Sequence, residues 1–124
     1  MGGVFIGLFA KRKVLGRIKE LYSCQVKAGM GGRTKNKGSC VMRFRVDNTS
    51  FAFLSCHLAS GDAIKSRTEM IKLILQEAFS KAKTLPRVMA HNCVFLFGDL
   101  NFRVSLSNAA AREALREKKI PHLL

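Results

Sequence analysis

An apolar run that ends in a glycine and two polar residues constrains the fold of this chain more than any other stretch. Val94 to Phe97 are apolar, and Gly98, Asp99 and Asn101 follow. A short unbroken apolar run is typical of a strand that is buried on both faces of a sheet. Because an unpaired carboxylate is costly inside such a strand, we expect the strand to end near Gly98. Asp99 and Asn101 then lie at its carboxyl end, where open α/β sheets bind ligands, although the same residues also suit a plain turn.

A second strand, Ser50 to Cys56, ends in the same manner and is followed by His57. Between the two strands, Asp62 to Lys83 carries apolar side chains at helical spacing. Two parallel strands that are joined by a crossover helix have their carboxyl ends at one edge of the sheet. We therefore expect His57, Asp99 and Asn101 to share one edge. A lone His at a strand end is more often a structural residue, so the combination is what favours a site.

Hydrophobic period and turn residues predict the remaining elements. Their order predicts a mixed α/β chain of the α+β type, in which helices pack on a sheet. The stretch at residues 14–26 is ambiguous, because its start suits a short helix and Leu21 to Val26 suits a strand. The further expected elements are a buried strand at Val4 to Ala10, a strand at Leu21 to Val26, a loop at Ala28 to Gly38, a half-buried strand at Cys40 to Val46, a turn at Asp47 to Thr49, a cap of the long helix by Ser60 or Asp62, and a last helix at Ala109 to Lys119 that is capped by Ser107 or Asn108.

The net charge of +14 among 124 residues is the strongest signal in the composition. Half of the basic residues fall between Lys11 and Arg45, where Glu20 is the only acid. Such a balance implies an anionic partner, which is a nucleic acid, a phosphorylated small molecule or an acidic membrane face. A surface that is charged only for solubility is the plainer alternative.

Cysteine usage and hydropathy bear on the compartment. None of the four cysteines belongs to a C-x-x-C pair, which argues against a zinc or thioredoxin-like motif. Free thiols favour a reducing compartment, and we expect the chain in the cytoplasm. No apolar run approaches the ~20 residues of a membrane span, so we expect no transmembrane segment.

A His, an Asp and an Asn at one sheet edge, beside a basic glycine-rich loop, suit phosphoryl chemistry. Basic side chains neutralise phosphate charge, and an Asp can accept a proton from attacking water. An amide can orient the water or donate to an oxygen of the transition state. The loop lacks the G-K-[ST] ending of a nucleotide-binding P-loop.

These residues resemble the motifs of a known family. The sequence Gly98-Asp99-Leu100-Asn101-Phe102-Arg103 is similar to the signature of the inositol polyphosphate 5-phosphatases, within the endonuclease/exonuclease/phosphatase superfamily. Asn36-Lys37-Gly38 resembles the family's N-K-G segment, and Ser55 to Gly61 resembles its S/N-x-H-L-A-A/S-G strand end. Arg67 matches an arginine that is usual early in the following helix. The motifs occur in the family's order over nearly the whole chain, whereas a lone G-D-x-N would also fit the nucleases of the superfamily.

The resemblance implies part of a β-sandwich flanked by helices, and Mg²⁺-dependent hydrolysis of the 5-phosphate of inositol polyphosphates or phosphoinositides. It implies that Asp99 helps to polarise the attacking water, that Asn101 holds the water or the scissile phosphate, and that His57 donates to the phosphate. Asn36 and Lys37 would face the other phosphates of the substrate or the lipid head group.

The resemblance allows two roles for each of two further arginines. Arg67 and Arg103 would be either substrate contacts or partners in buried structural pairs. The implied binding partner is an inositol phosphate or a phosphoinositide head group, with an acidic membrane surface as a second partner and no nucleic acid. The implied location is cytoplasmic, or peripheral at membranes.

The resemblance also implies that residues 1–124 are a partial catalytic domain that lacks both ends. The family's principal metal-binding Glu lies upstream of the region that matches Met1, and its S-D-H motif would lie beyond Leu124. We therefore expect no metal ligand within the chain, with the main Mg²⁺ ligand upstream, and no activity from this chain alone. The alternatives are a Mg²⁺-dependent nuclease of the same superfamily and a non-catalytic basic module that binds phosphoinositides.

Overall fold

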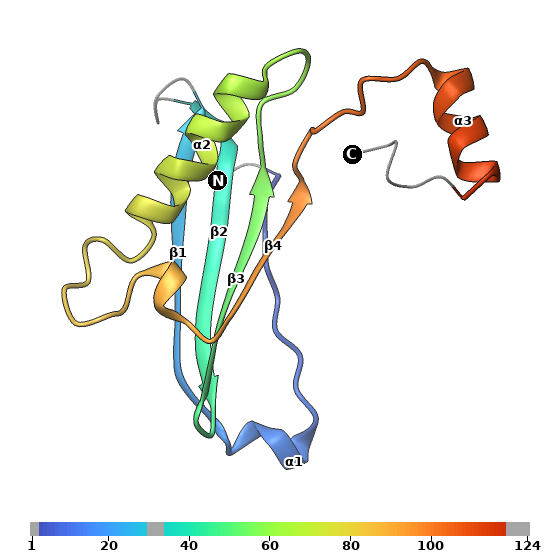
Figure 1. The fold of residues 1–124 in the computed structure, drawn as a ribbon. Helices are drawn as coiled ribbons and strands as arrows, with labels where there is room; N and C mark the ends of the chain where they lie inside the picture. The colour runs from blue at the N-terminus through green and yellow to red at the C-terminus, as the bar shows by residue number, and fades with distance from the viewer. Residues whose placement is uncertain (1–2, 30–33, 119–124) are drawn as a thin grey trace.

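The computed structural model describes residues 3–29 and 34–118 (Figure 1). In that part of the chain, a four-stranded sheet is covered on one face by the long helix α2, and helix α3 stands away from the sheet. The elements are α1 at Arg12–Leu15, β1 at Ile18–Gly29, β2 at Thr34–Val46, β3 at Thr49–His57, α2 at Ile64–Glu77, the 3₁₀ helix η1 at Val88–Ala90, β4 at Cys93–Asp99 and α3 at Asn108–Arg116.

The strands lie in the sheet in chain order, β1-β2-β3-β4. The pairs β1–β2 and β2–β3 are antiparallel, whereas β3 and β4 are parallel and are connected through α2. The register of the parallel pair runs from Phe51 opposite Cys93 to His57 opposite Asp99. The two strand ends therefore meet at one edge of the sheet, as the strand–helix–strand pattern predicted.

The core lies between α2 and the sheet face that α2 covers. Met70 and Ile74 are buried at helical spacing on α2, and they pack with Val41, Leu54 and other apolar side chains of the sheet. Val41 and Leu54 are opposite each other on β2 and β3, so they belong to the same face. Burial of one Leu or Ile side chain contributes about 1.5–3 kcal/mol, and this layer fixes α2 over the strands.

The opposite face of the sheet carries a row of phenylalanines. The rings of Phe44 and Phe53 are stacked with centroids 5.6 Å apart, and those of Phe53 and Phe95 are 4.8 Å apart. Phe51 extends the row at 5.4 Å from Phe44. Phe95 is 47% exposed, so this face is less covered than the face under α2.

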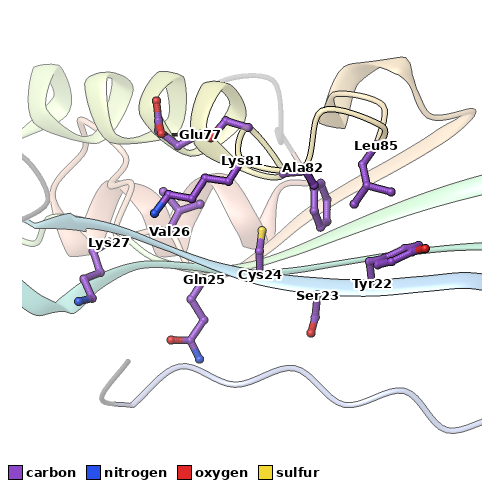
Figure 2. A pocket seen from close by; sticks show the side chains of 12 residues that line it. Tyr22, Ser23, Cys24, Gln25, Val26, Lys27, Glu77, Lys81, Ala82 and Leu85 are labelled. Carbon is purple, nitrogen blue, oxygen red and sulfur yellow. Dashed lines mark hydrogen bonds between the residues drawn. The ribbon is translucent and has the colours of Figure 1, made fainter.

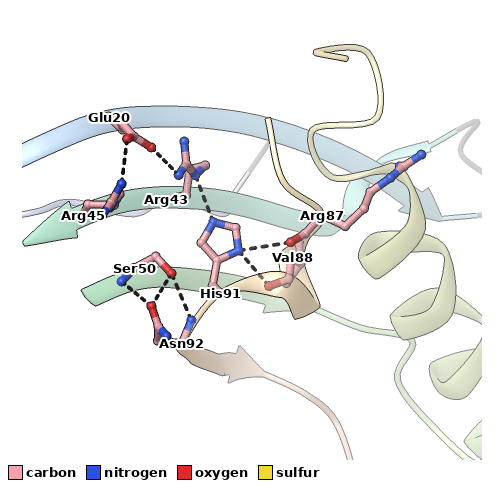
Figure 3. Close-up of polar contacts among 8 residues, drawn as sticks. All are labelled: Glu20, Arg43, Arg45, Ser50, Arg87, Val88, His91 and Asn92. Carbon is pink, nitrogen blue, oxygen red and sulfur yellow. Dashed lines mark hydrogen bonds and ion pairs between the residues drawn. The ribbon is translucent and has the colours of Figure 1, made fainter. Parts of the chain in front are cut away.

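A polar network that is buried at Arg43 and His91 and exposed at Glu20 joins β1, β2 and the segment before β4 (Figure 3). Arg43 is 2% exposed, and its Nε donates to Nε2 of His91 at 2.9 Å. Nη2 of Arg43 donates to Glu20 at 2.8 Å, and Nη1 of Arg45 lies 3.3 Å from the same carboxylate. Nδ1 of His91 lies 2.9 Å from the carbonyl oxygen of Val88. The strand predicted at Cys40 to Val46 is confirmed, as part of the longer β2. Arg43 can be buried on this strand because its guanidinium group has hydrogen-bond partners.

The strand predicted at Val4 to Ala10 is wrong. This segment is irregular, and Phe5 and Phe9 are 85% and 98% exposed. An apolar run becomes a strand only where a neighbouring strand accepts its hydrogen bonds, and the described residues supply none at this position. The Cys40 thiol ties this segment to the sheet, because it donates to the carbonyl oxygen of Val4 at 3.2 Å.

The ambiguous stretch at residues 14–26 holds both predicted structures, because α1 ends at Leu15 and β1 begins at Ile18. The loop predicted at Ala28 to Gly38 is too long, since β1 extends to Gly29 and β2 begins at Thr34. The part of that loop at residues 30–33 lies outside the described residues. Paired strands reach further into a glycine-rich stretch than its composition indicates.

The helix predicted at Asp62 to Lys83 is confirmed, but it is shorter. Its N-cap is Ala63, which makes no side-chain cap, so the predicted capping by Ser60 or Asp62 is wrong. The helix ends before Phe79, whose φ of 61° is left-handed and cannot continue the helix.

In the last helix, α3, the predicted cap is confirmed, because Oγ of Ser107 accepts from the backbone N–H of Ala110 at 3.2 Å. The predicted end at Lys119 lies outside the described residues. None of the helices in the described ranges has the length and apolar character that a membrane crossing needs.

Candidate functional site

Four of the predicted site residues, Lys37, His57, Asp99 and Asn101, come together where β3 and β4 end. His57 and Asp99 are opposite each other in the parallel register, and Nε2 of His57 lies 3.6 Å from Oδ2 of Asp99. The backbone N–H of Leu58 donates to the carbonyl oxygen of Asp99 at 2.9 Å, which continues the ladder beyond the two strands. The side chains of His57 and Asp99 are 32% and 61% exposed, so both are accessible from solvent.

Lys37 reaches the same edge from the neighbouring strand β2. Its Nζ lies 2.7 Å from Nε2 of His57, and Gly38, the next residue, is opposite His57 in the antiparallel register. An ammonium group only donates hydrogen bonds, so Nε2 of His57 is the acceptor in this contact. The imidazole is then neutral and carries its proton on Nδ1. The edge thus places a cation and a neutral imidazole beside an exposed carboxylate.

Two glycines permit this close arrangement. Gly98 has a φ of 108°, and a Cβ at this position would lie 2.3 Å from the carbonyl oxygen of Cys56. Gly38 has a φ of 143°, and a Cβ there would lie 2.0 Å from the carbonyl oxygen of Val26. Any side chain at either position would push neighbouring backbones apart. The glycines next to Asp99 and Lys37 are therefore required by the packing of the strands.

Asn101 is fixed over the edge by two hydrogen bonds. Its backbone N–H donates to Oδ1 of Asp99 at 3.2 Å, and its Nδ2 donates to the carbonyl oxygen of Leu58 at 3.0 Å. Its φ of 55° is left-handed, a conformation that Asn tolerates better than most residues. With one N–H of Nδ2 engaged in this way, the amide oxygen and the second N–H remain for water or a ligand.

The three other predicted residues lie in different surroundings. Asn36 and Arg103 are exposed, on β2 and on the segment after β4. Arg67 is 1% exposed, and its Nη1 donates to the carbonyl oxygens of Ala59 and Gly61. Of the two readings that the sequence left open for Arg67, the structure supports the buried one. No sequence signal identified Phe102, whose ring lies 5.2 Å from the Arg67 guanidinium carbon.

Two pockets bear on the location of the site. A cleft beside the strand ends is lined by residues 3–7, 55–57 and 97–99, which include His57 and Asp99. A second pocket lies between β1 and the segment that follows α2, and it contains none of the predicted site residues (Figure 2). Burial raises the pKa of the Cys24 thiol in this second pocket, which keeps it protonated and a poor nucleophile. The cleft beside the strand ends is therefore the candidate active site.

The described residues do not form a metal centre by themselves. Within residues 3–29 and 34–118, no three His, Cys, Asp or Glu side chains are grouped so that they could hold an ion. Mg²⁺ prefers six oxygen ligands in octahedral geometry, and Asp99 is the one carboxylate at the described part of this edge. These residues do not fit the Mg²⁺ that the sequence resemblance implies, unless other residues supply the remaining oxygens.

The chain is similar to a known protein family over its whole length. Residues 1–124 match the model of the endonuclease/exonuclease/phosphatase family 2. A probable inositol polyphosphate 5-phosphatase of Schizosaccharomyces pombe is 34% identical over 137 residues, which cover 98% of this chain and 12% of that protein. Synaptojanin of Caenorhabditis elegans is 35% identical over 116 residues, which cover 92% of this chain and 10% of that protein. The chain thus spans only a small part of the length of the curated relatives it matches.

A solved structure has the same fold. It is the inositol polyphosphate 5-phosphatase domain of a synaptojanin, in complex with inositol (1,4)-bisphosphate and a calcium ion. It matches with a TM-score of 0.71 and 25% sequence identity, over 90% of this chain and 32% of that chain. The prediction of an α+β chain with this family's fold is confirmed by the match.

Proposed function

Because the chain belongs to the endonuclease/exonuclease/phosphatase family 2, we propose that it provides the phosphate-handling edge of an inositol polyphosphate 5-phosphatase. Its reaction is the hydrolysis of the 5-phosphate from an inositol polyphosphate or a phosphoinositide. The observation that carries this proposal is the meeting of Lys37, His57, Asp99 and Asn101 at one exposed edge of the sheet. The names of the relatives and of the matching structure support the substrate class.

The arrangement suits hydrolysis by water. The exposed carboxylate of Asp99 can accept a proton from the attacking water, which makes the water a better nucleophile. The amide oxygen of Asn101 can hold that water, because the hydrogen bond from Nδ2 to the carbonyl oxygen of Leu58 fixes the orientation of the amide. Lys37 neutralises charge on the phosphate, and the neutral imidazole of His57, whose Nε2 contacts Lys37, can donate its remaining N–H to a phosphate oxygen. This electrostatic stabilisation grows as charge develops in the transition state.

Substrate recognition involves the basic side chains next to this edge. Asn36 precedes Lys37 on β2, and Arg103 follows Asn101 after β4, and both are exposed. We assign them to the other phosphates of the ring or to the lipid head group. The net charge of +14 supports an anionic substrate and contact with an acidic membrane surface from the cytoplasmic side.

Metal dependence is a separate element of the proposal. The matching structure contains a calcium ion, and the motifs of this chain resemble a Mg²⁺-dependent family. Because the described residues contain no three-ligand group, the ion requires ligands from elsewhere in the full-length protein. We therefore treat residues 1–124 as part of a catalytic domain, and we expect this segment alone to give no turnover of soluble inositol trisphosphate with Mg²⁺.

A nuclease is the second candidate, because the same net charge would also suit a DNA backbone. Phosphate release from inositol trisphosphate and from phosphoinositide vesicles, measured against nicking of plasmid DNA, separates the two reactions. Binding to the vesicles without phosphate release or nicking would instead identify a non-catalytic basic module.

The test of the catalytic assignment is Asp99→Asn in the full-length protein. Loss of a general base lowers kcat by about 10²–10⁴-fold, and the Asn keeps the shape of the side chain. Asp47→Asn is the matched control, because Asp47 is exposed in the turn between β2 and β3 at the other end of the sheet. Unchanged phosphate release by Asp99→Asn would contradict the assignment.

A further inference from the structure

Arg67 is a buried cation without an acidic partner. Its side chain is 1% exposed, and no carboxylate in the described part of the chain lies within ion-pair distance of it. Its Nε is buried and has no hydrogen-bond partner among the described residues. Burial of an unpaired charge is costly, so such a residue persists only where its other contacts offset the cost.

The contacts of Arg67 join two loops that are distant in sequence. Nη1 donates to the carbonyl oxygen of Ala59 at 3.1 Å and to that of Gly61 at 2.8 Å, so it holds the loop that follows β3. The guanidinium carbon also lies 5.2 Å from the ring centroid of Phe102, in the loop that follows β4. A cation over an aromatic face is attracted by the electron-rich face of the ring, and the attraction is stronger when the cation is desolvated.

These two loops carry the groups that handle water and phosphate. His57 immediately precedes the first loop, and Asn101 immediately precedes Phe102 in the second. The loops also bond directly to each other, because Nδ2 of Asn101 donates to the carbonyl oxygen of Leu58 at 3.0 Å. The contacts therefore form a closed ring. Arg67 bonds to Ala59, the neighbour of Leu58 in the chain, Leu58 accepts from Asn101, and Phe102, the neighbour of Asn101, contacts Arg67.

We propose that Arg67 is a positioning residue that locks the two loops together and so fixes the amide of Asn101 over the end of the sheet. The proposal rests on the function given above and names a residue that controls the geometry of the same site. A direct role in substrate binding does not fit a side chain that is 1% exposed. A role confined to the start of α2 does not account for the contact with Phe102, which is not part of the helix.

The position suits this role because α2 begins directly after the first loop and is packed on the sheet. Arg67 lies in the first turn of α2, and its own helix is fixed by Met70 and Ile74 in the core. A side chain held by a packed helix restricts loops better than loop residues restrict each other. Displacement of a reacting group by about 1 Å can lower the rate by about 10²-fold.

The first experiment compares Arg67→Met, Arg67→Lys and Phe102→Leu in the full-length protein by hydrogen exchange with mass spectrometry. We expect faster exchange in residues 57–62 and 99–103 of Arg67→Met, with exchange in 40–54 unchanged. Phe102→Leu replaces a ring that is 53% exposed, so we expect the variant to fold, and it should loosen 99–103. Thr68→Ala, at the exposed neighbouring position on α2, is the matched control and should change neither region.

The second experiment measures turnover of soluble inositol trisphosphate by the same variants. We expect kcat to fall by about 10–100-fold in Arg67→Met, with KM within threefold of wild type and partial recovery in Arg67→Lys. A rise in KM at unchanged kcat would identify a substrate contact and overturn the proposal. Unaltered exchange and kcat in both Arg67→Met and Phe102→Leu would also overturn it.

The two experiments separate the positioning role from the proposed function. If wild type releases no phosphate but the loops loosen as expected, the function fails and the locking of the loops stands. If wild type is active and Phe102→Leu behaves as Thr68→Ala does, the locking fails and the function stands. Faster exchange throughout the sheet in Arg67→Met, with no local effect in Phe102→Leu, would mean a role in general stability and would overturn the proposal.

Discussion

The ammonium group of Lys37 and the imidazole of His57 are in direct contact, with Nζ 2.7 Å from Nε2. Because the ammonium group can only donate, the contact selects the imidazole tautomer that is protonated on Nδ1. The second neighbour, Oδ2 of Asp99, lies 3.6 Å from the same nitrogen and would need a proton there. The two neighbours therefore favour opposite protonation of Nε2, and the shorter distance, to Lys37, favours the tautomer that is protonated on Nδ1.

We predict that the resting His57 ring is the neutral Nδ1–H tautomer, and that Lys37→Met shifts it toward the Nε2–H form. Nitrogen chemical shifts of ¹⁵N-labelled histidine distinguish the two tautomers, and loss of the His57 signals in His57→Gln assigns them. Lys27→Met is the control, because Lys27 is exposed on β1. If the His57 ring of the wild type carries its proton on Nε2, Lys37 does not donate to Nε2 in the resting protein, and the prediction is wrong.

Gly98→Ala should disrupt both the sheet edge and the site. The added Cβ would lie 2.3 Å from the carbonyl oxygen of Cys56, and the φ of 108° is strained for any L side chain. Backbone strain of this kind costs about 1–3 kcal/mol before the clash is counted. We expect a lower free energy of unfolding in a denaturant titration, together with loss of phosphate release.

The control for this change is Gly16→Ala. A Cβ at Gly16 meets nothing within 4 Å, and its φ of −68° suits alanine. Its free energy of unfolding should stay within about 0.5 kcal/mol of wild type. Equal stability of the two variants would mean that β3 and β4 do not approach each other as closely as described.

The parts of this fold that follow local rules were predictable from the sequence. The apolar run at Val94 to Phe97 and the helical spacing after His57 were enough to place Asp99 and His57 at one edge of the sheet, because crossover connections have a fixed geometry. The strand predicted at Val4 to Ala10 failed because strand formation depends on a partner, which no local pattern reports. Helix ends failed for the same reason, since the left-handed Phe79 has no sequence signal.

The site was predictable as a set of residues but not as a set of contacts. Sequence motifs named Lys37, His57 and Asn101, yet they did not indicate that Lys37 bonds to the imidazole or that Asn101 bonds to Leu58. Such contacts join strands that are far apart in the chain, so their geometry is decided by the register of the sheet. The contact between Arg67 and Phe102 was not predicted, because the two residues lie in different elements and neither local pattern indicates the other residue.

Burial on α2 provides a matched pair of core and surface substitutions. Ile74 is 0% exposed between the helix and the sheet, whereas Ile64 is 62% exposed in the first turn of the same helix. We expect Ile74→Ala to lower the free energy of unfolding by about 2–5 kcal/mol, because it removes buried methylenes and leaves a cavity. Ile64→Ala should change it by less than about 0.5 kcal/mol, since alanine favours helix and little area is lost. If thermal or denaturant unfolding gave the same loss of stability for both variants, the core would not lie between α2 and the sheet.

The last prediction concerns pH and the Glu20 carboxylate. The hydrogen bond from Arg43 is the largest of the effects that lower the pKa of Glu20, and Arg45 adds to it. A carboxyl group with a lower pKa in the folded state stabilises the fold above its unfolded pKa, which is near 4.5. That contribution is lost as the pH falls from about 5 through the folded pKa.

Glu20→Gln removes this titration and keeps the shape of the side chain. We expect the difference in unfolding free energy between wild type and Glu20→Gln to be constant from pH 7 to pH 6, and to shrink steadily below pH 5. The difference should be small and should decrease with salt, because the carboxylate is open to solvent. The Arg17–Asp47 pair, which also lowers the pKa of its carboxyl group, is present in both proteins and cancels from the difference. Parallel curves down to pH 3 would mean that Glu20 is not paired with Arg43 in solution.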